Sequence, residues 1–397
     1  MSSKSKVLML APQPFFSPRG TPFSVYYRTL VLTELGYPVD ILTYGQGEDV
    51  DLPGVRIIRT PGLRWLGRIK TGPSGLKIIH DLFMVIYFFG LQLKNRYAIV
   101  HAHEEAVFFA TLFKPLLRYK LVYDMHSSLP EQLSNFNFTT SRLLIGMFER
   151  LELWSLKVAD AVITICPALA DQVAEIAPWA QAKHRLIENS IFESVRLQNA
   201  GQGDAATAEL DAHLQDQDER KLIVYAGTLE HYQGIDILLE AAQLLAGKRQ
   251  DFLLIIAGGR PEQVAHYQHL LAAGFAHQIR LIGQISPDAA RALTLKADVI
   301  LSPRSSGNNT PLKTYEQLAS GVPLVATRIY SHTQVLSDEM CVLTELDGES
   351  FCTGIESLLD DVELGERLAS QAQRHYEQHY AKPVYTKKLA EILGMLN

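Results

Sequence analysis

A polar loop that leads into a helix holds the residues whose types and spacing best suit chemistry. The run S-S-G-N-N-T-P-L-K-T-Y-E-Q-L-A-S-G-V-P-L-V-A-T occupies residues 305–327. Thr310 and Pro311 suit a helix start, as a capping residue and a proline at the first helical position, and Gly321 suits its end. Lys313 then falls in the first turn, where its charge opposes the helix dipole unless an anion is bound. The pattern predicts a phosphate site.

Glu316 lies one turn beyond Lys313 on the same predicted helix. Its carboxylate could accept two hydrogen bonds from vicinal hydroxyls such as those of a ribose. Alternatively, it could form an i,i+3 ion pair with Lys313, which would contribute about 0.2–0.5 kcal/mol. The residues alone leave both interpretations open.

Two further turns between a strand and a helix suit an anionic ligand. Residues 226–234, A-G-T-L-E-H-Y-Q-G, form a glycine turn that can approach a diphosphate. The first turn of the chain lacks the G-x-G-x-x-G spacing after Leu10, but Gly20 permits close approach of its backbone to a ligand. A nicotinamide cofactor is therefore not expected.

Histidines follow two of the predicted strands. His126 comes directly after residues 121–125 and could hydrogen-bond a ligand hydroxyl, or it could be a structural histidine with internal partners. His101 and His103, in H-A-H-E-E, could bind a metal by themselves, but no further ligand motif supports them. We predict that no metal is bound.

Apolar runs of four to six residues alternate with helical patterns along the whole chain, which is typical of parallel sheets with crossover helices. The predicted strands are 7–10, 39–43, 55–59, 99–102, 121–124, 161–165 and 185–187, then 222–225, 252–257, 279–282, 299–301, 324–326 and 341–343. Three helical stretches, 348–359, 362–380 and 384–396, follow. The fold class is therefore α/β, with two tandem Rossmann-like doubly wound domains and an expected ligand cleft between them.

A change of composition marks the predicted domain boundary. Residues 198–220 are rich in Gln, Ala, Asp and Gly and read as a linker with an exposed helix. The domains are then 1–197 and 221–375, and a final helix within 376–397 is expected to pack back on the first domain. A length of 397 residues agrees with two domains of ordinary size.

Composition excludes several classes of protein. With 47% hydrophobic and 20% charged residues the chain is a well-packed globular protein, and a net charge of −6 argues against nucleic acid as a partner. The three cysteines have no metal-ligand spacing, and residues 1–6 lack the apolar core of a signal peptide. We therefore expect a cytoplasmic protein.

One segment is unusually basic and is followed by an apolar run. Residues 52–80 contain six basic side chains (Arg56, Arg59, Arg64, Arg68, Lys70 and Lys77) and no acidic one, and Trp65 lies among them. The apolar run 82–91 that follows is too short to cross a bilayer. It is either a buried helix of the first domain or a helix facing a membrane or lipid acceptor, so residues 52–93 are a candidate contact with an anionic membrane surface.

Several of these motifs together resemble the family 4 (group 1) glycosyltransferases of the GT-B fold. The most specific is residues 311–327, P-L-K-T-Y-E-Q-L-A-S-G-V-P-L-V-A-T. Gly20, His126, the turn 227–236, and Glu188-Asn189-Ser190, where relatives carry an N-G dipeptide, support it. The resemblance covers nearly the whole chain.

The resemblance implies transfer of a hexose, with retention of anomeric configuration, from a nucleotide diphosphate sugar, and it implies no metal. By the same resemblance, Glu316 binds the ribose and His126 contacts the transferred sugar, while the first domain holds the acceptor and the second binds the donor. The catalytic candidates are His126, Lys313 and Glu316. The donor-binding candidates are Gly20, Thr228, Gln233, Arg304, Gly307, Asn308, Asn309, Thr310, Pro311 and Leu312.

The chain departs from the family pattern at three positions. Asn308 replaces the first of two acidic residues that are usually eight positions apart, and Thr228 and Gln233 stand where an arginine and a lysine are usual. Loss of one preorganised donor can raise the barrier by roughly 2.7–4 kcal/mol. We hypothesise that Lys313 replaces the missing cations, with Arg304 or Arg19 as further candidates.

The sequence therefore predicts a glycosyltransferase that acts at the inner membrane face on a lipid-linked or polysaccharide precursor. The alternatives are a catalytically weak scaffold that binds sugar nucleotides, which the missing cations favour, and a nucleotide-sugar epimerase of the same fold.

Overall fold

The computed structural model describes most of the chain, as two compact units. The described residues are 4–17, 20–62, 67, 69, 75–128, 130, 141–189, 191–192, 213–214, 219–271 and 273–396. Unit 1 comprises residues 1–200 and 382–397, and unit 2 comprises residues 201–381. The predictions for Arg19, Arg64, Trp65, Arg68, Lys70, Ser190 and most of the linker 198–220 fall outside the described residues.

Unit 1 is built on a parallel sheet in the order β3-β2-β1-β4-β5-β6-β7. Its strands are β1 (Val7–Ala11), β2 (Val39–Thr43), β3 (Arg56–Arg59), β4 (Ile99–His103), β5 (Lys120–Met125), β6 (Ala161–Thr164) and β7 (His184–Leu186). Its helices are α1 (Gly20–Glu34), α2 (Gly75–Asn95), α3 (Ala106–Leu117), α5 (Arg142–Val158), α6 (Pro167–Ile176), η2 (Pro178–Lys183) and α15 (Lys382–Met395).

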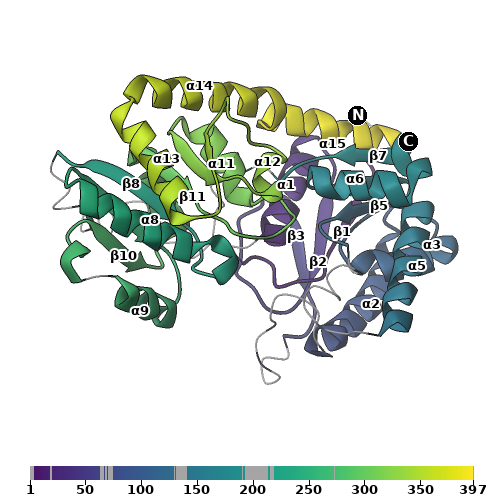
Figure 1. Ribbon diagram of the computed structural model, residues 1–397. Helices are drawn as coiled ribbons and strands as arrows, with labels where there is room; N and C mark the ends of the chain where they lie inside the picture. Colours follow the sequence, from purple (N-terminus) through teal and green to yellow (C-terminus); the bar gives the residue numbers. More distant parts are fainter. Residues whose placement is uncertain are drawn as a thin grey trace. The chain divides into compact units, whose positions relative to one another are not determined.

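Helices cover both faces of this sheet because its central strands are apolar on both sides (Figure 1). In β1, Val7 and Met9 pack in one core with α1 and α15, whereas Leu8 and Leu10 pack in the other with α2, α3, α5 and α6. Leu389 and Ile392 of α15 are fully buried in the first of these cores. The last described helix of the chain is therefore part of the first unit.

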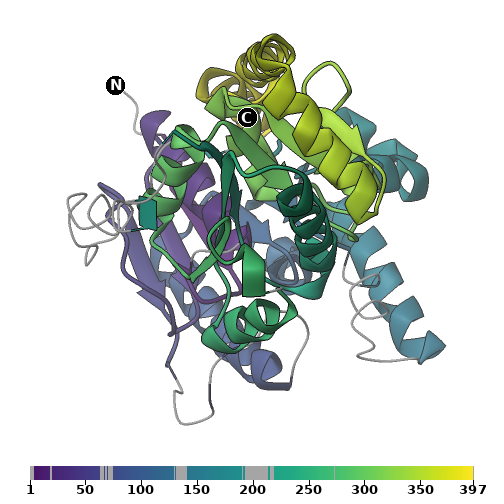
Figure 2. The ribbon, with the colours of Figure 1, turned by 60° about the vertical axis from the view of Figure 1, so that its left-hand side comes forward.

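Unit 2, most of which is drawn in green to yellow in Figure 2, repeats the plan. Its parallel sheet has the order β10-β9-β8-β11-β12-β13. Its strands are β8 (Lys221–Ala226), β9 (Phe252–Ala257), β10 (Ile279–Gly283), β11 (Val299–Ser302), β12 (Leu324–Thr327) and β13 (Val342–Thr344). Its helices are η3 (His231–Gln233), α8 (Ile235–Lys248), α9 (Pro261–Leu270), η4 (Ala273–Phe275), α10 (Pro287–Lys296), α11 (Leu312–Ser320), α12 (Tyr330–Thr333), α13 (Gly348–Asp360) and α14 (Val362–His379).

Both strand orders reverse direction beside the first strand of the unit, between β1 and β4 and between β8 and β11. Doubly wound sheets bind ligands at such points, outside the carboxyl ends of the strands. The predicted α/β class and both Rossmann-like sheets are confirmed, with each predicted strand found within two residues of its expected ends.

The docking of α15 gives a stability prediction. Leu389→Ala should lower the free energy of unfolding of unit 1 by about 2–5 kcal/mol, because it removes a fully buried side chain from the core. Urea unfolding followed by tryptophan fluorescence isolates this unit, since Trp65, Trp154 and Trp179 all belong to it. The matched control, Leu116→Ala at a side chain 68% exposed, should change the free energy by about 0.5 kcal/mol or less.

Candidate functional site

Two loops of unit 2 pack against each other at the switch point of its sheet. One follows β8 and ends at Gly234, whose φ is +70° and whose Cα lies so close to Pro303 that a Cβ would be 1.8 Å from that residue's carbonyl oxygen. The other follows β11, and the backbone N–H of Ser305 donates to the carbonyl of Tyr232 at 3.0 Å. This close approach brings the predicted turn 226–234 and the predicted loop 305–312 to one place.

The helix that follows the second loop begins one residue later than predicted. Pro311 is the N-cap, with φ −64° and ψ 139°, and Leu312 is the first helical residue of α11. The sequence prediction was wrong because the fixed φ of proline suits both positions, and only ψ decides between them. Thr310 is not the cap, and its hydroxyl oxygen is buried without a hydrogen-bond partner among the described residues. Gly321 ends the helix in the left-handed region, as predicted.

Lys313, in the first turn of α11, places a cation at this junction. The residue as a whole is half-buried, but its Nζ is out of solvent and has no hydrogen-bond partner in the described part of the chain. The Nζ lies 4.4 Å from the centroid of the Tyr225 ring, and a Cβ on Gly227 would be 3.3 Å from it. Burial, with the nearby charge of Arg304, lowers the pKa of Lys313 to about 7.

Arg304 supplies a second cation in the same region. Its Nε donates to the carbonyl of Ser306 at 2.8 Å, and its Cζ lies 5.1 Å from the centroid of the Tyr232 ring. Burial lowers its pKa. Neither Arg304 nor Lys313 forms an ion pair with a carboxylate of the described residues, so an anion bound between these loops would relieve their repulsion.

Glu316 has no ion pair with Lys313 among the described residues, so the i,i+3 alternative is not formed. Burial raises the pKa of the Glu316 carboxyl, while the charge of Arg291 acts in the opposite direction. The Glu316 carboxylate is thus available to accept hydrogen bonds from a ligand.

The remaining donor candidates line the two loops in different environments. Gln233 is buried, and its Oε1 has no hydrogen-bond partner in the residues described. Thr228 is exposed, and its carbonyl accepts a hydrogen bond from the Tyr225 hydroxyl at 2.7 Å. Asn308 is also exposed, and Gln334 donates to its carbonyl. The other four belong to the same loop and the start of α11: Gly307, Asn309, Pro311 and Leu312.

A pocket of about 460 Å³ opens beside the first loop, at the carboxyl ends of β9 and β10. Gly259, Val264, Leu281 and Gln284 are among its lining residues. The Gln263 amide joins this region to the turn by donating to the carbonyl of Leu229 at 3.0 Å. Leu281 and Val264 give the lining an apolar part, and Gln268 and Gln284 give it a polar one.

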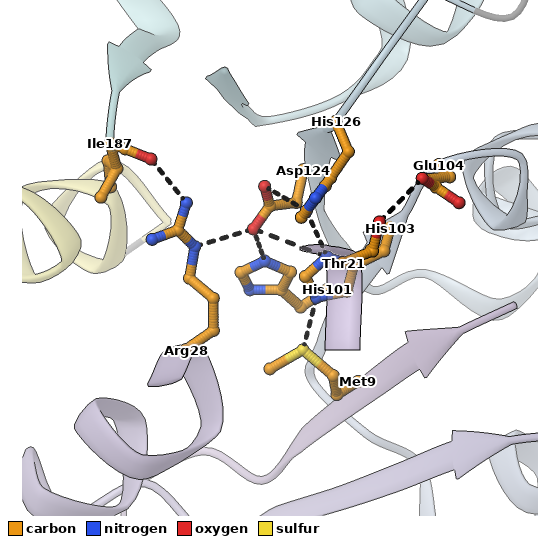
Figure 3. A network of polar contacts seen from close by, with 9 residues as sticks. All are labelled: Met9, Thr21, Arg28, His101, His103, Glu104, Asp124, His126 and Ile187. Carbon is orange, nitrogen blue, oxygen red and sulfur yellow. Dashed lines mark hydrogen bonds and ion pairs between the residues drawn. The ribbon is translucent and has the colours of Figure 1, made fainter. Parts of the chain in front are cut away.

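Unit 1 holds a buried polar network at the carboxyl ends of β4 and β5 (Figure 3). The Oδ2 of Asp124 accepts from Arg28 Nε at 2.9 Å and lies 2.9 Å from His101 Nε2. The Nε2 of His126 lies 3.2 Å from the other carboxylate oxygen and 2.9 Å from His103 Nδ1. His126 is only 4% exposed, so in this structure it is a member of an internal network.

Two further elements hold the guanidinium of Arg28. Its Nη2 donates to the carbonyl of Ile187 at 2.9 Å (Figure 3). Its Cζ lies 4.8 Å from the centroid of the Tyr385 ring on α15. Although burial acts to raise the pKa of Asp124, Arg28 and the histidines together hold it well below its usual range. Burial lowers the pKa of His101, so the network has one ion pair and a neutral imidazole at pH 7.

The same residues are the candidate metal ligands of the H-A-H-E-E motif. Ligand atoms of His101, His103 and Asp124 lie within 4.8 Å of one another. However, these atoms contact each other, His126, the thioether of Met9 and the permanent charge of Arg28. These contacts form a hydrogen-bonded network among the described residues, and the absence of a bound metal remains a prediction from the sequence.

Around this network, the same edge of the sheet carries further polar groups. Gly20 is exposed at the start of α1, and the hydroxyl of Thr21 donates to Glu104 at 3.1 Å. Lys77 pairs with Glu105, whose pKa is raised to about 7 by burial.

Sequence reasoning singled out His126, His101 and His103 but missed Asp124 and Arg28. Asp124 on β5 and His126 directly after it are two residues apart, as His101 and His103 are on β4, and the register pairs His103 with Asp124. This period of two was a usable signal for one polar face. The sequence offers no comparable signal for Arg28, because an arginine within a helix normally reads as a surface residue.

His332 of unit 2 was also missed. It is buried between β11 and β12, with its Nε2 3.0 Å from the Ser302 hydroxyl and its Nδ1 2.8 Å from the Thr327 carbonyl. Burial lowers its pKa to about 4, and the charges of Lys313 and Arg304 contribute. A neutral His332 beside these cations supports the strand ends without adding to the local charge.

Two Rossmann-like domains in tandem, each with its candidate residues at the switch point, define the GT-B class of glycosyltransferases. Family models agree: "Glycosyl transferase 4-like domain" matches residues 29–190, and "Glycosyl transferases group 1" matches residues 207–375. The chain belongs to the group 1, family 4-like glycosyltransferases.

Individual relatives are distant. The chain is 25% identical to alpha-D-kanosaminyltransferase of Streptomyces kanamyceticus, over 69% of this chain and 71% of that protein. It is 21% identical to one component of the phosphatidylinositol N-acetylglucosaminyltransferase of Arabidopsis thaliana, over 90% and 76%. HepE of Anabaena, solved in complex with UDP, matches the fold with a TM-score of 0.69 and 17% identity, over 98% of this chain and 100% of that one.

The buried network gives a second stability prediction. Asp124→Asn should lower the free energy of unfolding of unit 1 by about 3–5 kcal/mol, because it leaves the Arg28 charge buried without a counter-ion. Urea unfolding monitored by tryptophan fluorescence measures it. The control Asp49→Asn removes an ion pair with Arg59 at a side chain 62% exposed, and should change the free energy by about 1 kcal/mol or less. Equal losses in both variants would show that the network does not stabilise the unit.

Proposed function

We propose that the protein transfers a hexose from a nucleotide diphosphate sugar to a hydroxyl group of a lipid-linked or polysaccharide precursor, with retention of anomeric configuration. One observation carries the donor assignment. The Lys313 ammonium is buried in the first turn of α11, beside Gly227 and Arg304, without a hydrogen-bond partner among the described residues. A diphosphate has the charge and the acceptor oxygens that this position lacks.

The donor would extend across the two loops of unit 2. The diphosphate would contact Lys313, Arg304 and the backbone of the Gly227–Thr228 turn. The ribose would contact Glu316, whose carboxylate accepts hydrogen bonds from both ring hydroxyls, and the base would enter the pocket beside Gly259. The hexose would reach the loop that contains Asn308. Each part of the donor is thus assigned to the group whose charge or polarity suits it.

In the proposed transfer, the acceptor oxygen forms a bond to the anomeric carbon while the bond from that carbon to the diphosphate oxygen breaks. The electron pair of the broken bond stays with the diphosphate, and the acceptor proton passes to the departing phosphate oxygen. Negative charge therefore develops on the diphosphate, where Lys313 and Arg304 stabilise it. The two cations take the place of the arginine and lysine that Thr228 and Gln233 replace.

The acceptor side of the proposal rests on unit 1. Gly20 and His126 lie at the carboxyl edge of its sheet, and His126 would contact the transferred sugar through a small shift of its ring. Support for a lipid-linked acceptor comes from a relative whose name specifies phosphatidylinositol.

A second candidate function is a scaffold that binds sugar nucleotides without turning them over. Exposed Thr228 and uncharged Gln233, at positions where relatives carry cations, favour it. Transfer of labelled hexose from the donor into a lipid or polysaccharide extract separates the two. Label in the product supports the transferase, whereas tight binding without transfer supports the scaffold. Interconversion of donor epimers in the absence of acceptor would indicate an epimerase.

Nucleotide binding tests the role of Lys313. In a thermal-shift panel of UDP, GDP and ADP, one nucleotide at about 100 times its dissociation constant should add about 2.7 kcal/mol to the stability of the wild type. Lys313→Met should weaken that binding by about 10- to 100-fold, because it removes a charge-assisted hydrogen bond. Lys296→Met, at an exposed lysine of the same unit, is the control and should bind as the wild type does.

The pKa of Lys313 gives a pH-dependent prediction for the same binding. With a pKa of about 7, the free protein holds this lysine largely neutral at pH 8. A bound diphosphate raises that pKa, so binding at pH 8 should take up close to one proton. Calorimetry in buffers of different ionisation enthalpy measures the uptake. Lys313→Met should abolish the uptake, and an unchanged proton count in that variant would exclude Lys313 as the group that protonates.

A further inference from the structure

The outward faces of three helices of unit 1 carry large apolar side chains in solvent. We call them the apolar face, defined by six residues that are each 58–85% exposed: Ile78, Leu82, Ile86, Leu112, Leu116 and Leu143. The first three belong to α2, the next two to α3 and the last to α5. Single exposed apolar residues are ordinary on a soluble protein, but clusters mark interaction sites.

These residues point the same way because the three helices cover one face of the sheet. Met84 of α2, Ala110 of α3 and Leu156 of α5 are all fully buried in one core against that face. Ring contacts join the helices laterally: Phe89 lies 5.7 Å from Phe113, and Phe108 lies 6.1 Å from Phe148, between ring centroids. The three helices therefore lie side by side on this face of the sheet (Figure 1).

Helix α2 is apolar on both of its sides. Its inward stripe contains Met84 and Phe88, both fully buried, and its outward stripe repeats Ile78, Leu82 and Ile86 at the same spacing of four residues. A helix that covers one side of a soluble domain normally presents polar residues on the other. The outward stripe of α2 is thus exposed and does not belong to a core cluster of the described residues.

The helix is longer than the apolar run 82–91, which by itself is too short to cross a bilayer. With 21 residues and a mean hydropathy of 1.5, α2 is by length and composition long and apolar enough to cross one. The contacts of its inward side argue for a different placement. Met84 and Phe88 belong to the sheet core, and the Gln92 side chain accepts from the Tyr97 backbone N–H at 2.8 Å and donates to its carbonyl at 3.4 Å. Spanning would break these contacts, whereas lying along a surface preserves them.

The basic residues beside the apolar face indicate what kind of partner surface it would contact. Lys94, Arg96, Arg118 and Lys120 are exposed where α2 and α3 end and the next strands begin. Helices α2 and α3 contain one acidic residue, Asp81, which bonds to the hydroxyl of Tyr44. Helix α5 adds Glu149 and Glu152, and Lys120 lies 3.9 Å from Asp160. Cations next to an apolar layer complement the anionic head groups and acyl boundary of a phospholipid bilayer.

From this arrangement we infer that the apolar face docks unit 1 onto an anionic phospholipid bilayer, with the outward side chains of α2, α3 and α5 entering the boundary between head groups and acyl chains. The membrane contact predicted for residues 52–93 is thereby extended to helices α3 and α5. The docking would place the carboxyl edge of the unit 1 sheet near a lipid-linked acceptor.

Co-sedimentation with vesicles tests the inference. The protein should bind vesicles of phosphatidylcholine with about 30% phosphatidylglycerol more tightly than vesicles of phosphatidylcholine alone, and about 0.5 M salt should weaken the binding. The triple variant Leu82→Glu, Ile86→Glu and Leu116→Glu should bind at least about tenfold more weakly. A matched control with the same added charge is Leu270→Glu, Leu295→Glu and Leu346→Glu, at exposed leucines of unit 2, and it should bind as the wild type does.

Three results would overturn the inference. The wild type could fail to bind either kind of vesicle, or both triple variants could lose binding equally. The third is a dimer that the first triple variant dissociates, without vesicle binding by the wild type, which would assign the face to a second copy of the chain. The thermal shift with nucleotide is measured on the same variants, because donor binding in unit 2 should persist when vesicle binding is lost. Failure of the docking inference is thus distinguishable from failure of the proposed transfer.

Discussion

The ion pair between Arg28 and Asp124 is the interaction on which unit 1 depends. Both side chains are fully buried, and together they join α1 to β5 and, through His101, to β4. Tyr385 and the carbonyl of Ile187 complete the surroundings of the guanidinium. Removing one partner of a buried ion pair is strongly destabilising, so this pair holds α1, β4 and β5 together at the edge where His126 lies.

In unit 2, in contrast, the two cations of the candidate site have no ion-pair partner among the described residues. Lys313 and Arg304 lie beside neutral partners, namely the rings of Tyr225 and Tyr232, in a region without a carboxylate counter-ion among the described residues. A protein that neutralised these cations internally would be more stable but would bind anions poorly. The chain thus contains one site with an internal buried ion pair and one site where Lys313 and Arg304 have no ion pair among the described residues, which suits the proposed anionic donor.

Much of this arrangement was predictable from the sequence. Buried strands such as 252–257 are continuous apolar runs, and their alternation with helices specifies parallel sheets, so both Rossmann-like units followed directly. Lys313 and Glu316 were found because a short motif places them on one helix. The start of α11 was missed by one residue because proline fits two positions, and Arg28 was missed because only tertiary contacts distinguish a buried arginine from an exposed one. The second apolar side of α2 was visible as composition, but its exposure required the sheet to be placed beneath it.

Helix α15 has a consequence for the order in which the protein is assembled. Its residues come after all of unit 2 along the chain, yet its Tyr385, Leu389 and Ile392 fill the core of unit 1. A ribosome therefore releases every strand of the first sheet long before the helix that covers one of its faces. During that interval the Arg28 charge and the adjacent apolar surface lack their cover, so the nascent first unit remains incomplete until this helix emerges and closes it.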